Sequence, residues 1–110
     1  MIIKELEFPV IKYHFKVFIY KERQELEDYF KKHNIQNLEG FSAGVFEIEE
    51  EGQIFFERRY IKGGIIAHEC NHLINQAFNW IRYTPDPYND EMQSYFLEWA
   101  FDQIEEIAKK

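Results

Sequence analysis

The sequence predicts a single α+β domain over residues 1–110, with a small antiparallel or mixed sheet packed against helices. Segments with the two-residue alternation of half-buried strands dominate the first half of the chain, and two long segments with helical spacing fill the second half. No linker, repeat or low-complexity segment divides them. The chain is 45% hydrophobic and 18% aromatic, so it carries enough apolar side chains for one core.

The N-terminal part is predicted to contain two strands and a helix. Residues 2–7 are the shorter strand, and Pro9 bounds it. Residues 10–20 alternate between apolar and polar positions, which is the period of a strand with one buried face. The apolar positions are Ile11, Tyr13, Phe15, Val17 and Ile19. Over residues 22–33 the period becomes helical, because apolar residues recur three and four positions apart on a charged background.

A hairpin is predicted next. After a connection over residues 34–44, two segments rich in Phe, Val, Ile and Tyr occupy residues 44–50 and 53–60. They flank Glu51-Gly52, whose composition suits a hairpin turn.

Two helices are predicted in the second half. A glycine pair at 63–64 breaks the chain, and a helix follows over residues 65–82. The segment TPDPYND ends this helix, because it combines two prolines with turn-forming residues. Asn89 or Asp90 can cap a last helix that reaches about Ala108.

The composition argues against nucleic acid and membrane partners. The net charge is −7, whereas nucleic acids and anionic membranes require clustered Lys and Arg. No apolar run approaches the roughly 20 residues of a membrane-spanning helix. Charges interrupt the N-terminal MIIKELEFPVIKYHF, which is unlike a signal peptide. The single cysteine, Cys70, leaves no intrachain disulfide, so a cytoplasmic location is expected.

The most informative motif is His68-Glu69-x-x-His72, within the predicted helix over residues 65–82. Two histidines four residues apart lie one turn apart on the same helix face, so their rings can converge on one zinc ion. The glutamate beside the first histidine can take a proton from the water that the metal activates. The motif fixes only three positions, so chance matches are common.

A helical wheel supports this placement. The polar arc of the helix holds His68, His72, Asn75, Gln76 and Asn79. The apolar arc holds Ile66, Cys70, Leu73, Ile74, Ala77, Phe78 and Ile81. Glu69 falls at the border of the polar arc. Both histidines therefore point away from the face that is expected to build the core.

A third protein ligand is expected, because catalytic zinc sites usually combine three protein ligands with one water. His14 and His33 are upstream candidates, but they belong to other elements and lack ligand spacing. Glu91 is the leading candidate, because it follows a proline-containing turn and opens the last helix.

The segments HECNH and DEMQS together resemble the gluzincin branch of the zincin metallopeptidases. In that branch, His-Glu-x-x-His is followed about 20 residues later by Asn-Glu-x-x-Ser-Asp, whose glutamate is the third zinc ligand. The resemblance covers roughly residues 43–105 and extends to small zincin-like proteins of phages and mobile elements. It implies a minimal zincin-like domain in which His68, His72 and Glu91 hold Zn²⁺ and Glu69 is the general base.

The chain departs from the gluzincin pattern in two ways. Tyr95 stands where the family has the aspartate that orients a histidine ligand. Its hydroxyl can accept that hydrogen bond, or it can act as a catalytic group that donates to a developing oxyanion. The alternative is that Tyr95 is a partly buried aromatic without a role in the site. Glu98 is another candidate for orienting a histidine. The chain also lacks the second lobe that walls a peptidase cleft, which bears on proteolysis more than on metal binding.

Peptide deformylase is a second resemblance, since its motif often reads HECDHL. That family takes a third ligand from the cysteine of an upstream EGCLS. Here EGFSAG occupies residues 39–44 and has Phe41 in place of the thiolate, and Cys70 falls on the apolar arc. Deformylase therefore ranks below the gluzincin interpretation.

Peptide binding is expected at the hairpin. An edge strand beside the metal helix can pair with an extended peptide, and Val45, Phe46 and Glu47 are the candidate contacts. The sequence thus predicts a zinc metallopeptidase-like hydrolase that cleaves a peptide or amide bond in a peptide or protein substrate. The competing predictions are a non-enzymatic protein-binding module and a metal-free structural protein. Two histidines and a carboxylate also suit non-haem iron, and the exposed aromatics leave room for a homodimer.

Overall fold

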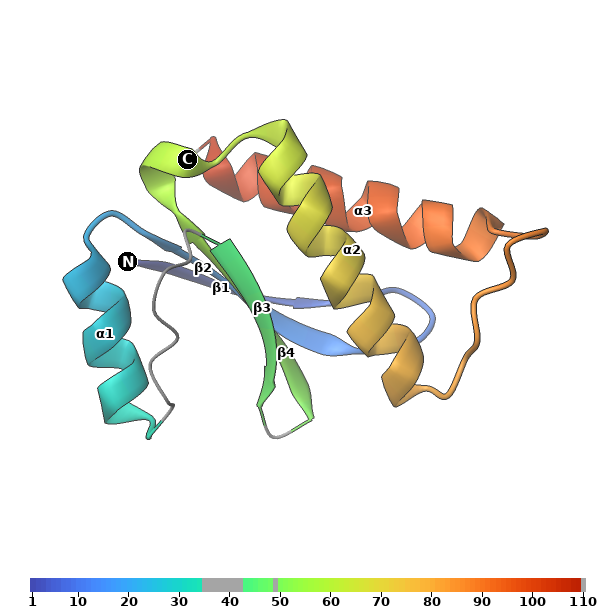
Figure 1. Cartoon of the computed structure of the whole chain (residues 1–110), viewed down its shortest axis with the longest axis horizontal. Coiled ribbons are helices and arrows are strands. Elements are labelled where there is room, and N and C mark those ends of the chain that lie inside the picture. Colours follow the sequence, from blue (N-terminus) through green and yellow to red (C-terminus); the bar gives the residue numbers. More distant parts are fainter. Residues whose placement is uncertain (35–42, 49, 110) are drawn as a thin grey trace.

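A four-stranded mixed sheet with helices on both faces forms the fold in the computed structural model, which describes residues 1–34, 43–48 and 50–109 (Figure 1). The element order is β1 (Ile2–Glu7), β2 (His14–Tyr20), α1 (Arg23–Lys32), β3 (Ala43–Ile48), β4 (Glu51–Glu57), the 3₁₀ turn η1 (Arg58–Tyr60), α2 (Gly63–Trp80) and α3 (Glu91–Ala108). The predicted α+β class is confirmed, with a mixed sheet and three helices.

The strand order β1-β2-β4-β3 makes β1 and β3 the two edges. β1 pairs antiparallel with β2, and β3 pairs antiparallel with β4. The central strands β2 and β4 are parallel to each other, so the chain between them has to cross over, and this crossover contains α1.

The two faces of the sheet carry separate apolar clusters. On one face, Phe15, Val17 and Ile54 pack with residues of α2 and α3 in the main core. On the other face, Phe18 and Phe55 stack with ring centroids 4.5 Å apart, and α1 covers them with Leu26 and Phe30. A strand with helices on both faces is apolar on both faces.

The predicted strand over residues 10–20 needs two corrections. The strand begins at His14, because Val10 and Lys12 have positive φ angles of 69° and 56°, which belong to a turn. Its even positions are also not all exposed: Phe18 and Tyr20 are buried on the face that α1 covers. The short strand over residues 2–7 and the helix in residues 22–33 are confirmed.

The hairpin turn was misplaced in the sequence-based prediction. Ile48 pairs with Glu51, so the connection lies between them, and Glu50 has a positive φ of 64°. Gly52 lies within β4, where a Cβ atom would come 2.8 Å from Leu73 Cδ1 of α2. This glycine therefore permits the close approach of the sheet to α2. The strand also ends at Glu57, before η1.

Helices α2 and α3 pack on the same sheet face and on each other. The glycine pair lies inside the first turn of α2, with Lys62 as the N-cap residue. Phe78 of α2 meets Phe96 of α3 with ring centroids 6.0 Å apart. Asp90 is the N-cap residue of α3, as predicted, but its side chain makes no capping hydrogen bond. No helix among the described residues is long and apolar enough to cross a membrane.

Candidate metal centre

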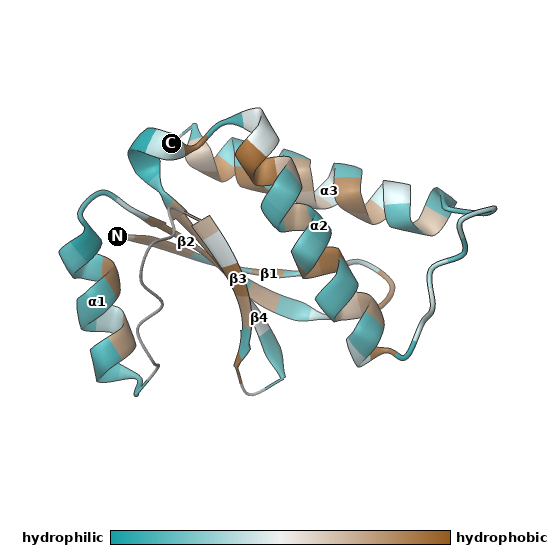
Figure 2. Cartoon of the chain, viewed as in Figure 1, coloured by the Kyte–Doolittle hydropathy of each residue, from teal (hydrophilic) through white to brown (hydrophobic). Residues whose placement is uncertain are grey.

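Helix α2 divides into a buried and an exposed side, and this division matches the predicted helical wheel. Figure 2 shows hydrophobic and hydrophilic segments alternating along the helix. The buried residues are Ile66, Glu69, Cys70, Leu73, Ile74, Ala77 and Phe78. Cys70 is fully buried, and burial raises the pKa of its thiol to about 12, followed by a smaller effect of Glu69. The prediction that Cys70 is a core residue is therefore confirmed.

His68 and His72 converge on the exposed side of α2. Their Nε2 atoms are 3.3 Å apart, and both side chains are exposed. Two nitrogens that bind one zinc ion at 2.0–2.1 Å with tetrahedral angles are separated by about 3.3 Å. The pair therefore has the spacing of two tetrahedral zinc ligands. The same separation also suits an N–H···N hydrogen bond between two neutral rings.

Glu69 is buried, whereas the two histidines of the motif are exposed. Its exposed fraction is 6%, and its Oε2 atom has no hydrogen-bond partner among the described residues. Its Oε1 atom lies 3.7 Å from His68 Nε2. Burial raises the pKa of Glu69, while His68 and His72 oppose this rise. A carboxyl group with a raised pKa beside a candidate metal site is typical of a general base.

These three residues form the one group of potential metal ligands within the described part of the chain. Nitrogen and oxygen atoms of His68, Glu69 and His72 all lie within 4.8 Å of one another. The motif interval alone produces this convergence, because all three residues belong to two successive turns of one helix.

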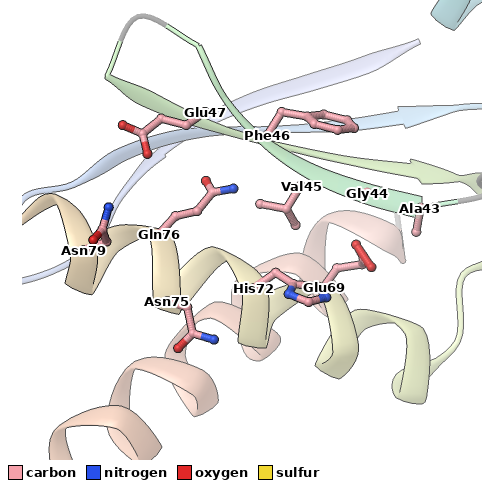
Figure 3. A pocket seen from close by; sticks show the side chains of 10 residues that line it. All are labelled: Ala43, Gly44, Val45, Phe46, Glu47, Glu69, His72, Asn75, Gln76 and Asn79. Atoms are coloured by element: carbon pink, nitrogen blue, oxygen red, sulfur yellow. The ribbon is translucent and has the colours of Figure 1, made fainter. Parts of the chain in front are cut away.

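A groove of about 650 Å³ runs between α2 and the edge strand β3 (Figure 3). One wall consists of Ala43, Gly44, Val45, Phe46 and Glu47. The other consists of Glu69, His72, Asn75, Gln76 and Asn79. The predicted edge strand and its three contact residues, Val45, Phe46 and Glu47, therefore lie beside the metal motif. Ala43, Gly44 and the three amides were not predicted as site residues, although the amides share the polar arc with the histidines.

The structure does not bring the predicted residues of α3 into this group. Glu91 is the first residue of α3 and is exposed, and it is not among the converging ligand atoms. Tyr95 is 53% exposed and contacts Phe96, with ring centroids 5.4 Å apart, and it does not line the groove. Glu98 is exposed further along α3. The roles predicted for Glu91 and Tyr95 therefore stay predictions.

The upstream histidines lie elsewhere. His14 Nε2 is 3.6 Å from Glu7 Oε1, across β1 and β2. The ring of His33 lies against Tyr29, with centroids 4.3 Å apart. Neither histidine joins the candidate metal centre. Phe41, which replaces the thiolate of deformylases, lies outside the described residues.

Comparisons with known proteins return no family. No protein-family model matches the chain, and neither curated proteins nor solved structures give a significant match. The gluzincin resemblance is therefore carried by the motif residues alone.

Proposed function

We propose that this domain is a zinc-dependent hydrolase of peptide or related amide bonds. The observation that carries the proposal is the 3.3 Å separation of the His68 and His72 Nε2 atoms beside the buried carboxyl group of Glu69. A structural zinc site would gain nothing from a glutamate between its ligands and would usually have four protein ligands.

Each residue of the motif has a distinct role in this proposal. His68 and His72 supply two nitrogen ligands, and Glu91 stays the predicted third ligand. Zinc, when bound there, would activate a water molecule and polarise the carbonyl group of the substrate. The carboxylate of Glu69 would take up the proton of that water and deliver it to the leaving nitrogen. Its burial favours this role, because burial raises the pKa of the carboxyl group and so makes the carboxylate a stronger base.

The groove supplies the place for the substrate. β3 pairs with β4 on one side, and it is the last strand on the other side within the described sheet. An edge strand offers backbone N–H and C=O groups on its outer side, so an extended peptide could pair with β3 and would lie along α2 beside Glu69 and His72. Main-chain pairing confers affinity with little dependence on sequence.

The proposal is tested by mass-spectrometric detection of cleavage of an unfolded protein, such as reduced and alkylated casein, by the zinc-loaded protein. We expect cleavage that a chelator abolishes and that stoichiometric zinc restores. The Glu69→Gln variant should retain zinc and cleave about 10²- to 10⁴-fold more slowly, which is the usual contribution of a general base. Asn71→Gln, an exposed change on the same helix, is the matched control.

Equal cleavage by the parent and the Glu69→Gln variant would point to a contaminating protease and contradict the proposal. Peptide binding without any cleavage would favour the protein-binding module instead.

A further inference from the structure

We infer that the groove selects peptides that carry a lysine or arginine side chain three to four residues from the cleaved bond, and that Glu47 binds this cation. Because this subsite lies in the groove between α2 and β3, the inference rests on the proposed function and names its substrate class. It follows from the position of Glu47, from the charge of the groove and from its unpaired acceptors.

Glu47 lies at the end of the groove that is remote from the metal motif. Figure 3 shows its carboxylate at the same end as Asn79, whereas Glu69 and His72 lie toward the end marked by Ala43. The Glu47 side chain is exposed, and it forms no ion pair with a described residue. Lys16 of the central strand β2 is paired elsewhere, with Glu51 at 3.3 Å and Glu5 at 3.8 Å. The Tyr13 hydroxyl lies beside this carboxylate and interacts with it. A carboxylate can accept several hydrogen bonds, so the exposed Glu47 side chain can still accept from a cationic ligand.

The groove lacks a compensating positive charge. Among the ten described residues that line it, none is a lysine or an arginine and two are glutamates. A zinc ion at the histidines would offset the charge of Glu69 at one end. The charge of Glu47 would then stay unmatched at the other end, so the groove would favour a substrate with a positive charge there.

Unpaired hydrogen-bond acceptors along the groove also favour a ligand that supplies donors. Gln76 Oε1 is buried and has no hydrogen-bond partner among the residues that the structure describes. The same holds for Oε2 of Glu69, a residue that is 6% exposed. Buried acceptors are nearly always paired in folded proteins, so these oxygens are suited to donors supplied by a ligand. Ammonium and guanidinium groups and peptide N–H groups are such donors.

The spacing between the two ends fixes where the cation belongs on the substrate. His72 and Asn79 are separated by seven residues of helix, which corresponds to roughly 10 Å. Ala43 and Glu47 are separated by four residues of strand, or roughly 13 Å. An extended peptide covers either length in about three to four residues. Both wall lengths therefore place the cationic side chain three to four residues from the cleaved bond.

The test uses zinc-loaded protein with the Glu69→Gln change, so that peptides bind without being cleaved. A neutral ten-residue peptide is scanned with lysine at each position, and each lysine peptide is paired with its norleucine counterpart. Fluorescence anisotropy measures the dissociation constants at low and high salt. We expect lysine to bind about fivefold more tightly at one position, which is the upper range for an exposed ion pair, and salt to weaken this preference.

Two further variants assign the preference to one carboxylate. Glu47→Gln should abolish it, and Glu47→Lys should favour a glutamate peptide instead. Glu50→Gln is the matched control, because Glu50 is exposed on the same hairpin but does not line the groove. No preference at any position, or an equal loss in the Glu50→Gln variant, would overturn the inference.

A parallel zinc titration and cleavage assay on the parent separate this inference from the proposed function. Zinc-dependent cleavage without a charge preference would refute the subsite alone. If the protein binds no zinc, the same lysine scan is run without metal. A charge preference that Glu47→Gln then removes would support the subsite and refute the hydrolase.

Discussion

The two halves of the predicted metal site differ in whether their predicted ligands lie close together. The half on α2 is assembled: His68 and His72 have Nε2 atoms 3.3 Å apart, and the carboxyl group of Glu69 lies beside them. The half on α3 is not, because Glu91 is exposed and lies outside the converging group. The difference shows that a ligand interval within one helix fixes geometry, whereas an interval across a connection does not.

The physical cause lies in what positions each half. Backbone hydrogen bonds within α2 set the histidines one turn apart, whatever the rest of the chain does. The position of Glu91 depends instead on how α3 docks. α3 packs through Phe96, Ala100 and Ile104 into the core that also contains the buried side of α2. The histidines occupy the exposed side of α2, so this packing does not by itself carry Glu91 to them.

The largest effect is expected from removing a ligand of the assembled half. His72→Ala should weaken zinc binding by more than about 100-fold, because even residues that only support a ligand contribute about 10- to 100-fold. Competition calorimetry with a chelator of known affinity measures this change. Asn75→Ala, on the same exposed side one turn further, is the matched control and should bind zinc like the parent. Equal affinity of the His72→Ala variant would remove α2 from the metal site.

The next effect is expected from disturbing the contact between β4 and α2, the helix that carries the assembled half. Gly52→Ala would place a Cβ atom 2.8 Å from Leu73 Cδ1, 3.0 Å from Tyr13 Cε2 and 3.2 Å from Phe15 Cβ. Overpacking of this kind usually costs about 1–3 kcal/mol, so we expect the free energy of unfolding in urea to fall by that amount. Gly64→Ala is the control, since nothing lies within 4 Å of a Cβ atom there. An unchanged stability of Gly52→Ala would mean that the Leu73 side chain or α2 can shift without cost, and would contradict a tight contact at Gly52.

A smaller effect is expected from the half that is not assembled. Glu91→Ala should weaken zinc binding by about 10-fold, less than His72→Ala, because part of the binding free energy of a third ligand is spent on bringing the start of α3 to the metal. The same calorimetric competition measures it, with Glu106→Ala, an exposed change near the other end of α3, as the control. An affinity equal to that of the parent would show that Glu91 is not a ligand.

The smallest effect concerns a carboxylate far from both halves and depends on pH. Backbone N–H groups of Lys21 and Glu22 donate to Glu25, and with the terminal amino group they lower its pKa. A carboxyl group whose folded-state pKa is lowered contributes stability above its unfolded pKa of about 4.3, and this contribution disappears as the pH falls through the folded pKa. The stability difference between the parent and Glu25→Gln should therefore be present at neutral pH and vanish in acid. A difference that does not change with pH would contradict this origin.

The sequence predicted local features well and long-range ones less well. The strand over residues 2–7, the helices and the division of α2 into two sides depend on periodicity, which is a local property. The burial of Phe18 and Tyr20 depends on α1 covering the second face of the sheet, which alternation within one strand does not reveal. The hairpin turn was misplaced because Gly52 looked like a turn residue, whereas it serves a close contact with α2.

The candidate site divides in the same way. The histidine pair and the groove contacts Val45, Phe46 and Glu47 were predictable from spacing and from the hairpin beside the metal helix. The burial of Glu69 was not, because it depends on the approach of β3 to α2. The position of Glu91 depends on the connection over residues 81–90 and on the docking of α3, neither of which an interval in the sequence determines.

The most direct test is the zinc content of the protein, measured by mass spectrometry after purification without a chelator or a metal-affinity step, followed by calorimetric titration with zinc. We predict about one zinc ion per chain, lost in the variant with both His68 and His72 replaced by alanine. A parent protein that contains no metal and takes up none from micromolar zinc would contradict the proposal. The 3.3 Å separation of the two rings would then be a hydrogen bond between neutral histidines.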